Sequence, residues 1–331
     1  MSRPKVLLLG EVKHAHETWA TIAQNADIVV PRSTDRAGFL SECRSGALDG
    51  VVAAYRTFSS NQTTGPLDAE AVPLLPESLK YICHNGAGYD SIDVAACTAR
   101  GIGVSHTPTP STTRRPTWPS GSCWELCGTS RPEKLPDKGH DPRGKTLGIL
   151  GMGGIGRNMA RKAALAFSMK VIYHNRTRLA AEDEGEAGEA KYVGFEELLR
   201  ESDVLSLNLP LNPSTKHLIS TPQLSQTKQG VVIVNTARGA VLDESALVTF
   251  LQSGHVASVG LDVYENEPAI HPDLINHPRA LLVPHMGTWT VETERAMEEA
   301  TMANVRSALA GTGLTSAVPE QKREEEAAEQ L

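Results

Sequence analysis

The chain has 331 residues, and at this length two domains are more usual than one. Hydrophobic residues make up 40% of it and charged residues 21%, and no apolar run reaches the roughly 20 residues needed to cross a bilayer. The formal net charge of -7 disfavours a surface for nucleic acid. We therefore expect a soluble protein that acts on small molecules, with neither nucleic acid nor a membrane as a partner.

The N-terminal residues and the cysteines favour the cytoplasm. Met1–Pro4 runs directly into the short apolar stretch Val6–Leu9, without the long apolar region of a signal peptide. Five cysteines at irregular positions suit a reducing compartment better than a disulfide framework. Cys123 and Cys127 are spaced like half of a metal site, but no second ligand pair accompanies them, so we expect no metal.

Short apolar runs alternate with stretches that can form helices along most of the chain. This alternation is typical of parallel strands connected by crossover helices. The first set of predicted strands covers residues 5–9, 27–30, 51–55, 81–84 and 104–107, and the second covers residues 146–150, 170–173, 204–209, 231–235, 258–263 and 281–283. The sequence therefore predicts an α/β fold with two doubly wound parallel sheets.

The C-terminal part of the chain is predicted to return to the first domain. Residues 291–309 form a long amphipathic stretch without proline, which favours a helix. We therefore expect a discontinuous first domain, 1–108 with 287–331, and a second domain at 109–286. Residues 320–331 are almost entirely Glu, Gln, Ala, Lys and Arg, a composition typical of a solvated chain end.

A glycine motif follows the first strand of the second set. Gly151–Gly156 has the spacing GxGxxG and lies between the predicted strand and a helix-compatible run at 157–167. Strand before and helix after make this motif a strong indication of a dinucleotide site, whereas the motif alone is a common glycine-rich turn. Gly151 allows the tight turn, Gly153 lets a pyrophosphate approach the backbone, and Gly156 lets helix and strand pack closely.

The end of the next predicted strand bears on the choice of cofactor. About twenty residues after the glycine motif, an acidic residue would bind the adenosine ribose of NADH. Asn175, Arg176 and Thr177 stand there instead, followed by Arg178. Their donors suit a 2'-phosphate, so NADPH is favoured over NADH, although the same residues also suit an exposed loop without a role.

Three chemically useful residues stand at or just beyond the ends of predicted strands in the second set. They are Arg238, Glu267 and His285. Open parallel sheets bind ligands at the carboxyl ends of their strands, so the three side chains should reach the same edge. Each alone suits a surface ion pair or a structural histidine, but together, downstream of a dinucleotide motif, they favour catalysis.

The order of the motifs resembles the D-isomer-specific 2-hydroxyacid dehydrogenase family, in particular its glyoxylate/hydroxypyruvate reductases. The motifs that carry the resemblance are Asn85–Asp90, Gly151–Gly156, Pro210–Leu211, Thr236–Gly239, Leu261–Pro268 and Pro284–His285. The resemblance implies two Rossmann-like domains, a flavodoxin-like substrate domain and an NAD(P)-binding domain. It also implies hydride transfer between NAD(P)H and a small 2-keto or 2-hydroxy acid, by a protein that in this family is a homodimer.

The same resemblance assigns roles to individual residues. His285 would protonate the ketone, Glu267 would accept the other ring proton and fix the tautomer, and Arg238 would bind the substrate carboxylate and the keto oxygen. The backbone around Ala87 and Gly88 would hold the carboxylate. Cofactor contacts are expected from Gly151, Gly153, Gly154, Ile155, Gly156, Asn175, Arg176, Thr177, Leu209, Pro210, Thr215, Thr236, Ala237, Asp262, His285 and Gly287, with Asp262 at the nicotinamide carboxamide.

The size of the substrate side chain stays open. Arg56 lies in a stretch that borders this side chain in the family, and it is either a second carboxylate partner or, as we prefer, a solvated loop residue. Glyoxylate, hydroxypyruvate and bulkier 2-keto acids all remain candidates.

Residues 111–139 depart from the family pattern. The family carries an apolar helix there that lies beside the nicotinamide and contributes to the dimer, whereas this chain has scattered Trp, Cys, Gly and Pro. Plausible codons for Pro110 to Arg131, read in a neighbouring frame, give VDDATADMAIWLLLGAVRNFT, which is the expected helix. We therefore hypothesise a frame or splice error in the recorded gene. The alternative is a true divergent loop. For the chain as written, we then expect the loss of a packed helix to expose apolar surface and to weaken the domain hinge, any dimer and the activity.

Two alternative functions use the same scaffold. Formate dehydrogenase resembles this family but lacks the glutamate partner of the histidine, so Glu267 speaks against it. A catalytically silent, corepressor-like protein that binds a dinucleotide shares even the three catalytic residues. Turnover of a 2-keto acid distinguishes the enzyme from this binding protein.

Overall fold

The computed structural model describes residues 3–108 and 140–322, which form two compact units. One unit contains the described residues up to 108 and those from 289 onward, and the other contains residues 140–288. The divergent segment 111–139, its Cys123 and Cys127, and the frame hypothesis lie outside the described residues.

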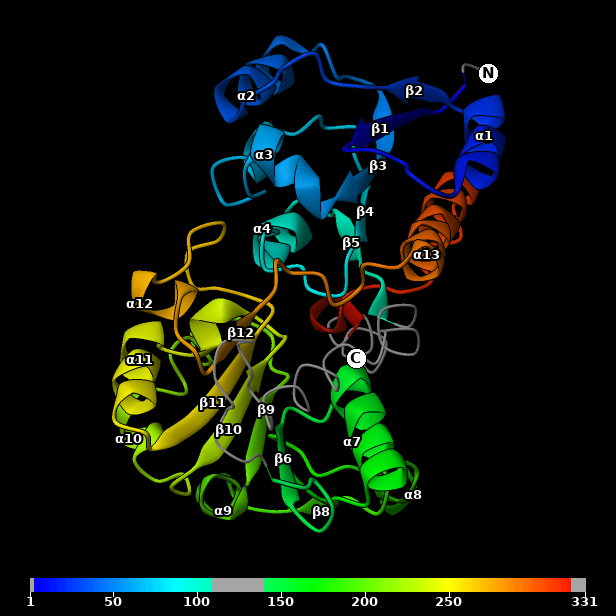
Figure 1. Ribbon diagram of the computed structural model, residues 1–331. Helices are drawn as coiled ribbons and strands as arrows, with labels where there is room; N and C mark the ends of the chain where they lie inside the picture. The colour runs from blue at the N-terminus through cyan, green and yellow to red at the C-terminus, as the bar shows by residue number, and fades with distance from the viewer. Residues whose placement is uncertain (1–2, 109–139, 323–331) are drawn as a thin grey trace. The chain divides into compact units, whose positions relative to one another are not determined.

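The first unit is built on a five-stranded sheet in the order β2-β1-β3-β4-β5, with every neighbouring pair parallel (Figure 1). Its strands are β1 (Lys5–Leu9), β2 (Asp27–Val29), β3 (Val51–Thr57), β4 (Tyr81–Asn85) and β5 (Gly103–Ser105). Its α-helices are α1 (His16–Asn25), α2 (Arg36–Ser45), α3 (Asn61–Thr64), α4 (Val94–Ala99) and α13 (Val291–Ala310). The alternation of strands and helices confirms the predicted parallel α/β architecture.

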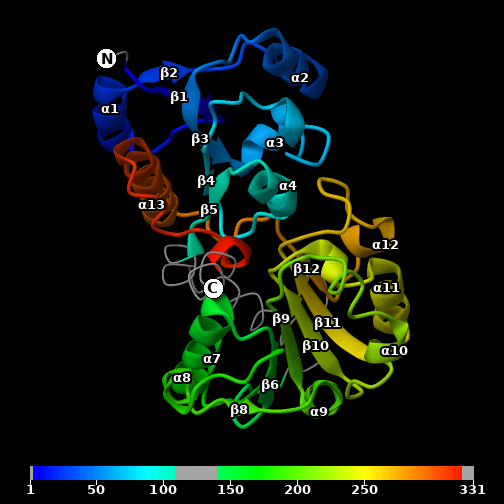
Figure 2. The same cartoon turned by 180° about the vertical axis from the view of Figure 1, so that it is seen from behind.

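The 20-residue helix α13 brings the C-terminal part of the chain back to this sheet (Figures 1 and 2). Met302 and Val305 are fully buried in a cluster that also contains Tyr55 of β3 and Cys83 of β4. Glu298 of the same helix is 3% exposed, and its carboxylate accepts hydrogen bonds from the backbone amides of residues 13, 14 and 15, at 2.7, 2.9 and 2.7 Å. The helix is therefore joined to the sheet by apolar packing and to the start of α1 by a buried carboxylate.

The second unit is built on a seven-stranded parallel sheet in the order β12-β11-β10-β9-β6-β7-β8. Its strands are β6 (Thr146–Leu150), β7 (Lys170–His174), β8 (Lys191–Tyr192), β9 (Val204–Leu207), β10 (Val231–Asn235), β11 (Val256–Leu261) and β12 (Ala280–Leu282). Its α-helices are α7 (Gly154–Phe167), α8 (Ala181–Glu186), α9 (Phe195–Glu201), α10 (Thr221–Leu224), α11 (Glu244–Gln252) and α12 (Pro272–Ile275). In this sheet β7 lies on one side of β6 and β9 lies on the other, so the strand order changes direction at β6. Open parallel sheets bind ligands at such a change of direction.

The central strands of this sheet are buried on both faces. All five residues of β10 and all four of β9 are buried, which is why these strands appear in the sequence as continuous apolar runs. The edge strand β8 has only two residues and was not predicted, because a strand so short carries no recognisable pattern.

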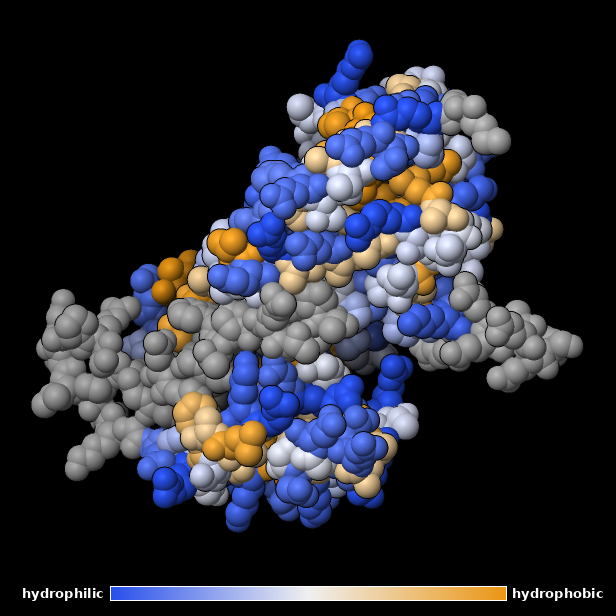
Figure 3. Space-filling view, turned by 90° about the vertical axis from the view of Figure 1, so that its right-hand side faces the viewer, coloured by the Kyte–Doolittle hydropathy of each residue, from blue (hydrophilic) through white to orange (hydrophobic). Residues whose placement is uncertain are grey.

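Figure 3 shows one face of the molecule coloured by hydropathy. On the face shown in Figure 3, hydrophilic residues predominate among the coloured ones, and hydrophobic residues form small groups between them. Within residues 3–108 and 140–322, the structure contains no helix with the length and apolar character to cross a membrane.

Candidate active site

The glycine motif forms the turn between β6 and α7. Gly151 has φ 96°, and a Cβ there would lie 2.7 Å from the carbonyl oxygen of Asn208. A Cβ on Gly156 would lie 2.4 Å from the carbonyl oxygen of Gly151, so helix and strand touch at that point. A Cβ on Gly153, by contrast, would meet nothing within 4 Å. The two inward glycines serve packing, whereas the exposed Gly153 leaves space for a ligand.

Neighbouring backbone groups hold this turn in place. The amide of Gly151 donates to the carbonyl of His174 at 3.0 Å, and the amide of Met152 donates to the side-chain oxygen of Asn175 at 2.7 Å. Gly153 is the N-cap of the 14-residue helix α7 and supplies no side-chain cap to it. The helix therefore presents its first amides and the positive end of its dipole to the turn, which fits a pyrophosphate.

Arg176 and Arg178, which follow β7, differ in their hydrogen-bond partners. Arg178 donates to both carboxylate oxygens of Glu184 at 2.9 Å. These bonds, together with one from the Tyr173 hydroxyl, lower the pKa of Glu184 to about 2. Arg176 and Thr177 are exposed, and Arg176 makes no hydrogen bond or ion pair with another residue of the described ranges. Arg176 is therefore the guanidinium available to a ligand here, while Arg178 is held by Glu184.

The loop after β9, which neighbours β6 in the sheet, carries the predicted residues Leu209, Pro210 and Thr215. The Thr215 hydroxyl donates to the carbonyl of Pro210 at 2.7 Å and accepts from the amide of Asn212 at 2.9 Å. Leu209 packs against the apolar core of the unit. These contacts give the loop a defined shape beside the glycine turn.

Arg238, Glu267 and His285 follow β10, β11 and β12, three strands that lie side by side at one end of the sheet. His285 Nδ1 lies 3.1 Å from Glu267 Oε2, and both side chains are about one-third exposed, 32% and 31%. Burial alone would raise the pKa of Glu267, but the hydrogen bond and charge of His285, the amide of Tyr264 and the charge of Arg238 together lower it. The carboxylate is therefore ionised at neutral pH.

The loop that carries Arg238 is fixed from two sides. Asn235 is fully buried, and its side chain donates to the carbonyl of Arg238 at 2.9 Å and accepts from the amide of Ala237 at 3.1 Å. Gly239 packs directly on the following segment, since a Cβ there would lie 1.9 Å from the carbonyl carbon of Tyr264. Sequence reasoning missed both supports, although an asparagine that ends a buried strand and a glycine after the arginine were visible signals.

The loop that carries His285 is held by Asp262. This carboxylate is 2% exposed and accepts from the amide of Met286 at 2.6 Å and from the amide of Gly287 at 2.9 Å. His285 itself has φ 51°, a left-handed conformation that few non-glycine residues adopt. The residue that we expected at the nicotinamide carboxamide therefore has both oxygens engaged in shaping the histidine loop.

The predicted carboxylate-binding loop Asn85–Asp90 lies in the first unit and begins at the last residue of β4. Three consecutive carbonyls accept hydrogen bonds within that unit: Gly86 from the amide of Thr107 at 2.9 Å, Ala87 from His106 Nδ1 at 3.0 Å and Gly88 from His84 Nε2 at 3.0 Å. Because C=O and N–H point to opposite sides of a trans peptide, the amides of these units point away from the bonded side. Within the described ranges, the amides of Ala87 and Gly88 have no hydrogen-bond partner.

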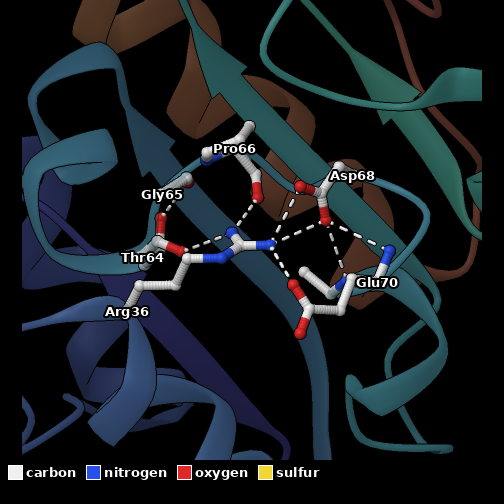
Figure 4. Close-up of polar contacts among 7 residues, drawn as sticks. Arg36, Thr64, Gly65, Pro66, Asp68 and Glu70 are labelled. Atoms are coloured by element: carbon white, nitrogen blue, oxygen red, sulfur yellow. Dashed lines mark hydrogen bonds and ion pairs between the residues drawn. The ribbon is translucent and has the colours of Figure 1, made fainter.

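An arginine clamp supports the segment behind this loop (Figure 4). Arg36 of α2 donates to Asp68 at 2.8 and 2.9 Å, to Glu70 at 3.1 Å and to the carbonyl of Pro66 at 2.6 Å. Leu67 lies within the clamped segment, and its amide donates to the carbonyl of Ser91 at 2.9 Å. The clamp thus reaches the chain just beyond the predicted carboxylate loop.

No group of three or more His, Cys, Asp or Glu side chains that could hold a metal occurs in residues 3–108 and 140–322.

Sequence comparison agrees with this geometry. The family profile described as "D-isomer specific 2-hydroxyacid dehydrogenase, NAD binding domain" matches residues 122–287. The chain belongs to the D-isomer specific 2-hydroxyacid dehydrogenase family. It is an oxidoreductase with a nicotinamide dinucleotide as cofactor, and the profile covers both the glycine turn and the three strand-end residues.

Full-length relatives extend the family likeness over both units. The chain is 48% identical over 332 residues to 4-methyl-2-oxopentanoate reductase A of Aspergillus oryzae, covering 96% of this chain and 99% of that protein. It is 39% identical over 350 residues to glyoxylate reductase 1 of Saccharomyces cerevisiae, covering 98% and 97%. A crystal structure of a glyoxylate reductase from Paecilomyes thermophila is 49% identical with a TM-score of 0.91, covering 97% of this chain and all of that one.

Proposed function

We propose that this protein reduces a small 2-keto acid to the D-2-hydroxy acid, and catalyses the reverse oxidation, at the strand ends that carry Arg238, Glu267 and His285. The 3.1 Å contact between His285 Nδ1 and Glu267 Oε2 carries this proposal, because it gives an acid/base pair beside an arginine. The bound nicotinamide supplies or accepts the hydride.

His285 is the proposed proton donor to the keto oxygen. The ionised Glu267 can only accept hydrogen bonds, so the ring nitrogen that faces it, Nδ1, carries a proton. Nε2 is then the nitrogen that exchanges a proton with the substrate. The carboxylate also stabilises the positive charge of the doubly protonated ring, the form that donates. Asp262 keeps the ring in position through the two amides that follow it.

Arg238 and the loop at Ala87 and Gly88 are the proposed carboxylate-binding groups. A guanidinium offers several donors in a plane and matches a carboxylate beside a keto oxygen. The amides of Ala87 and Gly88 have no partner among the described residues, while their carbonyls are held. Such paired amides form a site for an anion.

The substrate class is proposed from the relatives. Their printed names include a 4-methyl-2-oxopentanoate reductase and glyoxylate reductases, so small and branched 2-keto acids are the candidates. We expect oxidation of NADPH or NADH with glyoxylate, hydroxypyruvate or 4-methyl-2-oxopentanoate, measured by loss of nicotinamide absorbance. No turnover of any of these acids by the folded protein would contradict the proposal.

Matched variants test the assigned roles. Arg238→Gln and His285→Gln should each lower kcat/KM by at least about a hundredfold, the usual contribution of a positioned proton donor. Cofactor affinity, followed by nicotinamide fluorescence, should stay within about threefold because neither group forms the glycine turn. Gln229→Ala, an exposed substitution in the same unit, is the control. Loss of cofactor binding with unchanged turnover per bound cofactor would overturn the roles.

NADPH is the proposed cofactor, because Arg176 is exposed beside the expected ribose position and no carboxylate takes its place. Arg176→Ala should raise the KM for NADPH about tenfold or more and leave the KM for NADH within about twofold, since only the former has a 2'-phosphate. Arg161→Ala removes an exposed arginine of α7 and serves as the control. An equal increase in the KM values for NADPH and NADH would refute the proposed preference for NADPH.

The divergent segment has its own test. The substrate panel is run in parallel on the chain as printed and on a second protein in which residues 111–131 carry the neighbouring-frame sequence. Activity confined to the second protein would support the frame hypothesis, and equal activity would contradict it. Light scattering of both proteins tests the homodimer that we propose on family grounds.

We also place the activity in the cytoplasm. Cys43, Cys83 and Cys97 are buried free thiols, which suits a reducing compartment. Localisation of a fluorescent fusion to another compartment would contradict this assignment.

A further inference from the structure

Arg56 is a buried cation behind the proposed carboxylate loop. It is the next-to-last residue of β3 and is 0% exposed, so the expectation of a solvated loop residue is wrong. The strand continues two residues further than predicted, and the parallel pairing of Arg56 with His84 on β4 places it inside the unit. Within the described ranges, no carboxylate forms an ion pair with it and its Nε has no hydrogen-bond partner. Burial of a guanidinium with an unsatisfied donor lowers the stability of the folded protein, so a functional role for Arg56 is worth seeking.

The contacts of Arg56 determine the protonation of His84. Arg56 Nη1 lies 3.2 Å from His84 Nδ1, and Nη2 donates to the side-chain oxygen of Asn61. A guanidinium can only donate, so His84 Nδ1 must be an unprotonated acceptor. The remaining ring nitrogen, Nε2, then carries the proton and donates it to the carbonyl of Gly88 at 3.0 Å. The guanidinium at Nδ1 and the carbonyl at Nε2 together select the tautomer whose proton is on Nε2.

The glycine before this loop leaves room for the ring. A Cβ on Gly86 would lie 2.6 Å from His84 Nε2 and 3.3 Å from the carbonyl oxygen of Gly88. The hydrogen bond between ring and carbonyl therefore requires glycine at position 86. The spacing of the motif Asn85–Asp90 thus serves the imidazole beneath it, in addition to any ligand above it.

We propose that Arg56 is a positioning residue for the 2-keto acid carboxylate, acting through the tautomer of His84 on the Gly88 carbonyl and so on the loop that carries the Ala87 and Gly88 amides. His84 draws the Gly88 carbonyl inward, and His106 draws the neighbouring Ala87 carbonyl inward at 3.0 Å. The amide in the same peptide unit as the Ala87 carbonyl is that of Gly88, so it points away from His106. The hydrogen bond from His84 holds Gly88 on the other side and so keeps the Ala87 and Gly88 amides in one conformation. This inference rests on the proposed function, since it assumes that the loop receives the substrate carboxylate.

The tautomer can be observed without any turnover. In two-bond proton–nitrogen spectra of histidine-labelled protein, we expect His84 to show a protonated Nε2 and an unprotonated Nδ1, with its signals identified by their loss in His84→Leu. In Arg56→Met, Nδ1 loses its donor, so the signals should shift towards a mixture of the two neutral tautomers. An unchanged tautomer in Arg56→Met would overturn the first step of the proposal.

Kinetic measurements test whether the tautomer of His84 affects the binding of the 2-keto acid. Arg56→Met and His84→Leu should each raise the KM for the 2-keto acid about tenfold, the loss expected for one hydrogen bond to a charged group, with kcat within about threefold. The KM for the cofactor should not change. His84→Gln keeps an amide donor for the Gly88 carbonyl and should restore KM to within about threefold of the unaltered protein. Arg44→Met removes an exposed arginine of α2 in the same unit and is the matched control.

The double variant separates an indirect effect from two independent ones. Because Arg56 acts through His84, the KM of the double variant Arg56→Met/His84→Leu should equal that of His84→Leu alone. Multiplied effects, or a lowered melting temperature with unchanged KM, would show a merely structural role and overturn the proposal. If the unaltered protein turns over no 2-keto acid, the proposed function fails by itself. The tautomer spectra and the affinity for oxalate, measured by calorimetry, then decide the positioning role.

Discussion

Replacement of Gly239 by alanine tests the idea that close contact between two loops sets the geometry of the active site. A Cβ at position 239 would lie 1.9 Å from the carbonyl carbon of Tyr264, 2.1 Å from its oxygen and 2.4 Å from the amide nitrogen of Glu265. These atoms belong to backbone and cannot rotate aside. To reach the 3.4 Å of an ordinary contact, the two loops must separate by about 1.5 Å.

That separation would move Arg238 away from the Glu267–His285 pair, because Gly239 directly follows the arginine and the contacted segment leads to Glu267. A misplacement of about 1 Å in catalytic groups costs on the order of a hundredfold in rate. We therefore expect Gly239→Ala to lower kcat/KM about a hundredfold and the free energy of unfolding by about 1–3 kcal/mol, the usual cost of overpacking. Urea denaturation and the nicotinamide absorbance assay measure the two quantities on one preparation.

A second glycine gives the matched control. A Cβ on Gly185 of α8 would meet nothing within 4 Å, and its backbone is helical. Gly185→Ala should leave activity unchanged and raise stability by about 0.5–1 kcal/mol, since alanine loses less backbone entropy in a helix. A folded Gly239→Ala protein with unaltered kcat/KM would refute the argument from loop contact.

Three further predictions concern Glu267, the buried Glu298 and the buried thiols. Folding lowers the pKa of Glu267, so the stability that its carboxylate contributes is present above the unfolded pKa and is lost as the pH falls through the folded pKa. Between about pH 6 and pH 3, the melting temperature should therefore drop more steeply in the unaltered protein than in Glu267→Gln. Parallel curves for the two proteins would contradict this prediction. Glu298→Gln should lower the free energy of unfolding by about 2 kcal/mol in urea, because an amide group cannot accept from three backbone amides as the carboxylate does, whereas an unchanged midpoint would show that the contacts are weak. Burial raises the pKa of Cys43 to about 11 and those of Cys83 and Cys97 to about 12, so iodoacetamide at about pH 8 should modify them only after unfolding; rapid labelling of the folded protein, read by mass spectrometry of peptides, would disprove it.

Much of the architecture could be predicted from local patterns. Apolar runs such as Val231–Asn235 identify buried parallel strands, and the glycine spacing at Gly151–Gly156 identifies the turn between strand and helix. Arg238, Glu267 and His285 could be grouped from their positions in the chain, because the carboxyl ends of parallel strands share one edge of a sheet. The predictions of the strands and of the glycine turn succeed because each depends on a few consecutive residues and on a rule of geometry that holds for every parallel sheet.

Tertiary structure decided what surrounds those residues. Arg56 follows an apolar run and is polar, so its sequence suggests a solvated loop, yet pairing with β4 buries it completely. Asp262 and Gly239 have partners that are adjacent only in the folded sheet, so no local pattern predicts which backbone they contact. Burial and hydrogen-bond partners depend on residues distant in sequence. For this protein, the sequence alone therefore determined the strands and the chemical groups, and the folded chain decided how each group is held.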